Sequence, residues 1–105
     1  MIPNRPYSEV WREAADHWTD LDNAARLLEE TKSAVLSKWM TEEGDVAVSK
    51  AELRVKASDR WKRFVESVVN ARTAADKAKI EMKYREMQYF EGQSKAATER
   101  VEARF

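Results

Sequence analysis

Apolar residues recur at alternating intervals of three and four along residues 11–39, and neither glycine nor proline interrupts residues 7–43. This spacing is the a/d seam of a coiled-coil helix rather than a loose amphipathic stripe. It predicts a helix from about residue 8 to 42, roughly 50 Å long, with Ser8 as its N-cap. Lys32 occupies one seam position, and the apolar members are Trp11, Ala14, Trp18, Leu21, Ala25, Leu28, Val35 and Trp39.

A second seam with the same spacing runs through residues 61–96 and predicts a long helix from about residue 59 to 103. Gly92 lies inside this seam, where glycine costs about 1 kcal/mol relative to alanine and allows a bend or a close backbone contact. Arg85 also lies on the seam, and Glu13 or Asp16 is expected within its reach. The other members are Trp61, Phe64, Val68, Ala71, Ala75, Ala78, Met82, Tyr89 and Ala96.

Residues 43–58 are predicted to connect the two long helices. Gly44 follows the last periodic residue and is the expected stop of the first helix. Ser49 and Glu52 have the spacing of a capping box, which predicts that a short helix starts at Ser49. Ser58 is a candidate N-cap that separates this short helix from the long helix after it.

The low turn content favours helices over a sheet, because the chain has only two glycines and two prolines in 105 residues. Matching seams joined by a compact connector predict a single all-α domain over residues 1–105. The expected architecture is an antiparallel, coiled-coil-like hairpin of long helices with a short connector helix. Its register follows from placing Trp39 beside Trp61, which pairs Ala25 with Ala75, Leu21 with Ala78, Trp18 with Met82 and Trp11 with Tyr89.

The residues that enzyme sites require are scarce. The chain has no cysteine and a single histidine, His17, so no metal site is expected, and no cofactor either. Glu13 and Asp20 lie one helical turn either side of His17, an arrangement that suits an exposed histidine on an acidic helix face. No glycine-rich phosphate loop is present, and we expect no catalytic residue. No membrane-spanning segment is evident, so a cytoplasmic location in a bacterial host is expected.

The predicted second long helix carries a further apolar set, offset from its seam by more than one stripe can hold. A two-helix hairpin has one inner side, so a second apolar face implies a second partner, either another copy of the chain or a different protein. We expect self-association, as a dimer or a larger assembly, through residues 80 to 105. The predicted protein interface is Ile80, Tyr84, Met87 and Phe90.

The formal net charge of zero conceals an asymmetry along the chain. Residues 1–52 hold 6 basic and 11 acidic side chains, whereas residues 53–105 hold 13 basic and 8 acidic ones. Either an acidic and a basic helix complement each other side by side, or the basic residues form a strip for phosphates. The four tryptophans suit base stacking too, although their seam spacing favours a core role. The candidate nucleic-acid contacts are Arg54, Lys56, Arg60, Lys62 and Arg63.

Several short runs bear on the class of protein. They are Val48-Ser49-Lys50-Ala51-Glu52, Ala57-Ser58, Phe64-Val65-Glu66, Ala71-Arg72 and the C-terminal Ala97-Thr98-Glu99-Arg100-Val101-Glu102-Ala103-Arg104. In these runs residues 48–105 resemble small all-helical accessory proteins of tailed phages and prophages, which are often encoded near recombination and replication genes. The resemblance implies a protein that binds and redirects a host or phage protein.

The expected function is therefore protein binding, as an adaptor or inhibitor of a nucleic-acid-processing protein in recombination or defence. Direct nucleic-acid binding through the basic cluster at residues 54–63 is one alternative. A structural subunit of an assembly is the other.

Overall fold

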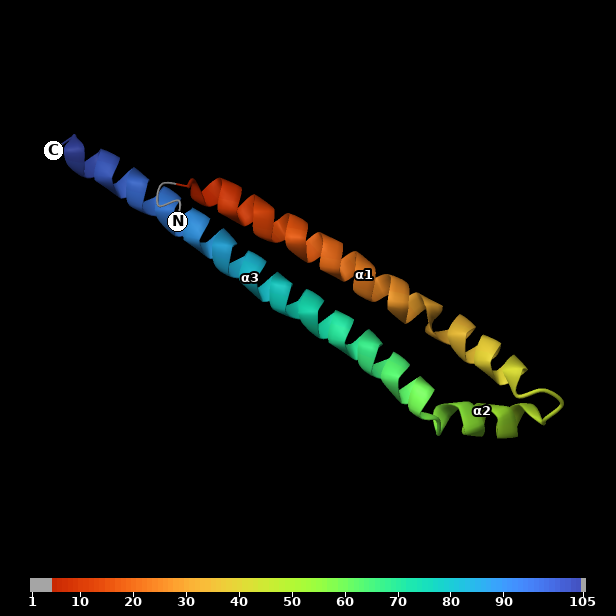
Figure 1. Cartoon of the computed structure of the whole chain (residues 1–105). Helices are drawn as coiled ribbons and strands as arrows, with labels where there is room; N and C mark the ends of the chain where they lie inside the picture. The colour runs from red at the N-terminus through yellow and green to blue at the C-terminus, as the bar shows by residue number, and fades with distance from the viewer. Residues whose placement is uncertain (1–4, 105) are drawn as a thin grey trace.

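The computed structural model describes residues 5–104, which form three helices and no strand. Helix α1 spans Tyr7–Glu42, α2 spans Val48–Lys56 and α3 spans Asp59–Ala103. Helices α1 and α3 lie side by side and antiparallel, and α2 crosses between them at the closed end (Figure 1). The molecule measures 84 × 25 × 16 Å, so the predicted all-α hairpin with a short connector helix is confirmed.

Helix α1 begins one residue before the predicted start, and its N-cap is Pro6 rather than Ser8. The Pro6 carbonyl accepts hydrogen bonds from the backbone N–H groups of Glu9 and Val10, at 3.1 and 3.2 Å. Ser8 therefore lies inside the first turn, and the prediction that it caps the helix is wrong. The φ of Pro6 is −58°, which its ring imposes and which suits entry into a helix.

Helix α2 begins at Val48 with Ala47 as N-cap, and no side chain caps it. The backbone carbonyl of Ala47 accepts from the N–H groups of Lys50 and Ala51, so Ser49 is already helical and cannot form the predicted capping box. Gly44 ends the first helix as predicted, with a φ of +80° that glycine adopts without strain.

The break between α2 and α3 is confirmed at Ser58. Its hydroxyl accepts from the Trp61 N–H at 3.2 Å and donates to the Val55 carbonyl at 2.5 Å. One side chain thus bonds the end of α2 and the start of α3, so these helices are separate elements that meet at a fixed point.

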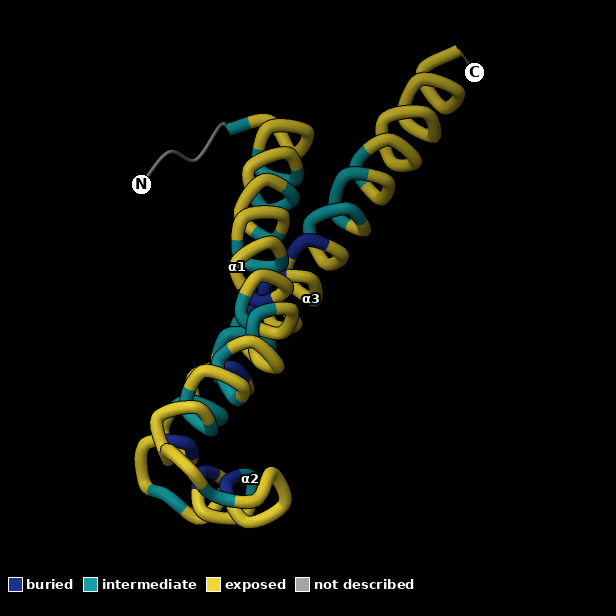
Figure 2. Tube along the Cα trace, turned by 90° about the vertical axis from the view of Figure 1, so that its right-hand side faces the viewer, coloured by how far each residue is buried: buried dark blue, intermediate teal, exposed yellow. Residues whose placement is uncertain are grey.

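The core follows the two predicted seams, as the buried and half-buried residues along the inner sides of α1 and α3 show (Figure 2). Ala25 and Ala75 have no exposed surface, which fits the predicted close approach of small residues in the middle. Aromatic pairs hold both ends of the hairpin. The ring centroids of Trp39 and Trp61 are 6.0 Å apart at the closed end, and those of Trp11 and Tyr89 are 5.2 Å apart near the open end.

Two charged seam positions depart from the apolar pattern. Lys32 is exposed, with its ammonium 6.0 Å from the centre of the Trp61 ring. Arg85 pairs within its own helix, donating to Glu81 at 2.8 Å and to Gln88 at 2.9 Å. Glu13 and Asp16 on the opposite helix, which were expected within its reach, form no ion pair with it among the described residues, and the guanidinium binds carboxylate and amide acceptors one turn away on α3 instead.

Gly92 of α3 lies beside the N-terminal end of α1, at Tyr7. The Tyr7 ring lies against it, so that a Cβ at this position would come within 3.0 Å of the ring. The expected close contact at Gly92 is therefore made by a side chain of α1. Beyond it, residues 93–103 of α3 extend past α1 with every side chain exposed (Figures 1 and 2).

Candidate protein-interaction face

The large apolar side chains that α3 exposes lie on one side of the helix. At 100° per residue they fall within an arc of about 120°, centred roughly opposite the seam that packs on α1. Their exposed fractions lie between 49% and 69%. We call this set the outer face; it comprises Val69, Ile80, Tyr84, Met87, Phe90 and Val101.

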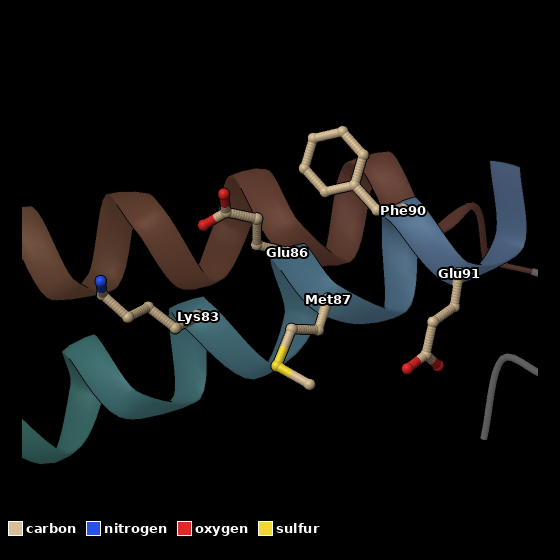
Figure 3. A pocket seen from close by; sticks show the side chains of 5 residues that line it. All are labelled: Lys83, Glu86, Met87, Phe90 and Glu91. Carbon is tan, nitrogen blue, oxygen red and sulfur yellow. The ribbon is translucent and has the colours of Figure 1, made fainter. Parts of the chain in front are cut away.

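A shallow depression of about 440 Å³ lies on the outer face. Met87 is at its centre and points away from α1, with Lys83 towards one end and Glu91 towards the other (Figure 3). Glu86 and Phe90 complete its lining. Lys83, Glu86 and Glu91 form no ion pair with any residue of the described chain. The depression therefore combines an apolar floor with charges that the hairpin itself leaves unused.

Phe90 has a double role. Its ring centroid is 5.9 Å from that of Trp11 and 5.3 Å from that of Tyr89, so it belongs to the aromatic cluster at the open end. It nevertheless exposes 54% of its surface. The other members of the predicted interface, Ile80, Tyr84 and Met87, are exposed. Tyr84 contacts only neighbours on its own helix among the described residues, since its hydroxyl accepts from Gln88 at 3.2 Å and the Arg85 guanidinium lies 5.4 Å from the centre of its ring.

The predicted basic cluster is gathered at the closed end, but its charges are largely paired. Arg54 pairs with Glu43 at 3.7 Å, Lys56 with Glu52 at 2.8 Å and Arg60 with Glu42 at 2.8 Å. The Arg60 guanidinium also stacks 3.9 Å from the centre of the Trp39 ring. Among the described residues, only two members of the cluster lack an ion pair, Lys62 and Arg63.

A second charged cluster joins the two long helices at Arg72. Its guanidinium donates to both carboxylate oxygens of Glu29, at 2.9 and 2.7 Å, and to Asp22 at 2.6 Å. The hydrogen bonds from Arg72 hold the pKa of Asp22 and that of Glu29 below their usual values, and Arg26 adds to the effect on Asp22 at 3.0 Å. The same bonds raise the pKa of Arg72. This cluster supports the interpretation that an acidic helix complements a basic one.

The remaining candidates take structural positions. Trp61 is buried and Trp11, Trp18 and Trp39 are half-buried on the seam, which suits a core better than a base-stacking platform. His17 is exposed. Within residues 5–104 no three His, Cys, Asp or Glu side chains gather where they could hold a metal ion. None of the three described helices combines the length and the apolar character that crossing a bilayer requires.

Sequence reasoning missed three contributors. Val69 and Val101 extend the outer face at both ends, and their angular positions around the helix would have revealed them. Arg72 is the third, and its acidic partners lie 43 and 50 positions away along the chain. Only the register of α1 against α3 brings them together.

Comparison with known proteins identified no relative of this chain. No protein-family model, curated protein or solved structure matches the chain.

Proposed function

We propose that this protein is a binding protein that acts as an adaptor or an inhibitor, and that the outer face of α3 is its interface. The observation that carries the proposal is the alignment of six exposed large apolar side chains on one stripe of a helix whose other side is already packed. Ile80, Tyr84, Met87 and Phe90 follow one another at intervals of three or four residues, and clustered exposed apolar surface of this kind marks interaction sites in water-exposed proteins. Tyr and Met are also side chains that interfaces favour.

The nature of the partner rests on the resemblance in residues 48–105 rather than on the fold. That resemblance favours a nucleic-acid-processing protein as the target. The rigid hairpin supports the proposal in another way, because a face on a continuous helix is already ordered before binding and loses little conformational entropy.

Photo-crosslinking tests the proposal directly. A photoreactive phenylalanine analogue replaces Tyr84 in one variant and Leu27 in a control, since Leu27 is an exposed apolar residue on the other long helix. We expect a discrete crosslinked species from position 84 in cells that express the chain, and none from position 27. The species should weaken by about tenfold when Met87→Lys is added, because a charge then enters the apolar face. Equal crosslinking from both positions, or none from position 84, would refute the proposal.

Direct nucleic-acid binding through residues 54–63 remains the alternative proposal. The ion pairs of Arg54, Lys56 and Arg60 weaken it, because a phosphate must compete with carboxylates already in place. Titration of labelled single- and double-stranded DNA at low salt separates the two. Affinity that falls steeply with salt and is lost on Lys62→Glu with Arg63→Glu would favour the alternative.

A further inference from the structure

We propose that the outer face of α3 binds a second copy of this chain in antiparallel orientation, around a two-fold axis at Met87. The inference rests on the proposed function, because it names the protein that occupies the same face. It commits to a partner whose surface is fully known, since an interface built on a two-fold axis uses the same patch twice.

The order of charges along the depression is the first argument. Lys83 precedes Met87 by four residues and Glu91 follows it by four, and neither has an ion-pair partner among the described residues. In an antiparallel pair, residues equally far from the axis on opposite sides face each other. Lys83 of each copy then faces Glu91 of the other. Each charge gains one partner, and the dimer contains two such pairs.

Parallel pairing has the opposite consequence. It sets Lys83 against Lys83 and Glu91 against Glu91, and like charges directly opposed across an apolar strip are destabilising. The charges of the stripe therefore select the antiparallel orientation.

The apolar residues select the position of the axis. With the axis at Met87, the two Met87 side chains meet, and Tyr84 of each copy lies opposite Phe90 of the other. Methionine adapts its shape to such a contact, and aromatic pairs stabilise an interface beyond the effect of the area that they bury. Moving the axis one turn earlier, to Lys83, sets Met87 opposite Lys79 and Phe90 opposite Asp76. Moving it to Phe90 sets Met87 opposite Gln93, so both shifts set apolar residues against polar or charged ones.

The same axis also uses the part of α3 that extends past α1. Residues 93–103 of one copy run along the outer face of the other, and Val101 lies opposite Thr73, one turn from Val69. Every member of the outer face except Val69 then lies opposite a described residue of the other copy. Helix α1 of each copy lies on the far side of its own α3, so the two α3 helices form the middle of a four-helix layer.

Single cysteines test the orientation and the register, because the natural chain has none. Met87→Cys places two thiols at the axis and should give a disulfide-linked dimer of twice the 12.2 kDa chain under mild oxidation. Ser94→Cys is the matched control on the same side of α3. In the proposed dimer its two copies are about 21 Å apart along the helices, since each lies seven residues from the axis. Crosslinking at position 94 should be at least tenfold slower.

Charge exchange tests the pairing. Lys83→Glu alone and Glu91→Lys alone each set like charges opposite one another, and each should weaken the dimer by about threefold to tenfold in sedimentation equilibrium. The double variant K83E/E91K restores opposite charges and should return the dissociation constant to within about twofold of the original. Far-UV circular dichroism checks that all three remain helical.

The outcomes separate this inference from the proposed function. A monomer at every concentration overturns the dimer, whereas the proposed function still stands if position 84 crosslinks to a different protein in cells. Equal crosslinking at positions 87 and 94, or a double variant no better than its singles, overturns the antiparallel arrangement at Met87.

Discussion

At the scale of single residues, Arg72 is the side chain that connects the two long helices most directly. It bonds Glu29 with two parallel N–H donors and Asp22 with a third, and both carboxylates lie on α1. Arginine suits this position because its planar fork presents several donors in one fixed geometry, which a lysine ammonium does not match.

Arg72→Lys should lower the thermal midpoint of the hairpin at neutral pH, since one ammonium cannot replace three directed bonds. The difference should shrink on acidification. The pKa values of Asp22 and Glu29 are lowered in the fold, so their contribution to stability is complete above the unfolded values near 4 and is lost as pH falls through the lowered ones. Thermal unfolding of both proteins at pH 7 and at about pH 3 checks this. A difference that stays constant between the two would contradict the role assigned to these carboxylates.

At the scale of elements, two serines in similar sequence patterns differ in whether they cap a helix: Ser58 caps α3, whereas Ser49 does not cap α2. Ser58 caps α3 because the residue before Asp59 is extended, with ψ at 150°. Ser49 has the better sequence motif, yet the chain is already helical at Val48. A cap needs a residue outside the helix whose side chain reaches back to a free N–H, so the backbone position of the serine decides its role.

Ser58→Ala should destabilise the hairpin by about 1 kcal/mol, because it removes the bond to the Trp61 N–H at the start of α3. Ser49→Ala is the matched control and should change stability by less than about 0.5 kcal/mol, as expected of an exposed substitution that removes no cap. Urea unfolding followed by circular dichroism compares the two. If Ser49→Ala is the more destabilising, the assignment of the caps is wrong.

At the scale of the whole molecule, the hairpin is an extended rod with a radius of gyration of 23.2 Å for its Cα atoms. The proposed dimer lengthens it further. Residue 59 at the closed end lies 28 residues from the axis, so the two closed ends are about 85 Å apart at 1.5 Å per residue.

Small-angle scattering measures this length. The variant Tyr84→Lys with Met87→Lys should remain helical, have the mass of one chain and give a radius of gyration near 23 Å. The natural chain should have twice that mass and a distinctly larger radius. If the two proteins have the same mass and radius, these residues do not mediate self-association.

Much of this fold was predictable because it depends on local pattern. The alternating intervals of three and four placed both long helices to within one residue of their observed ends, and the pairing of Trp39 with Trp61 set a register that the contact of Trp11 with Tyr89 confirms. The exposure of Ile80, Tyr84 and Met87 was predictable for the same reason, since their angular offset from the seam follows from the helical repeat.

The helices, the seam and the surplus apolar face follow from the amino-acid pattern alone, because each depends on spacing within one continuous segment. Tertiary structure decided which charges are already paired. It joined Arg72 to Asp22 and Glu29 and paired Arg54 with Glu43 and Arg60 with Glu42. Within residues 5–104 it left Lys83 and Glu91 without an ion pair. Ion pairs form between side chains that packing brings within a few ångströms, and separation along the chain does not reveal that distance.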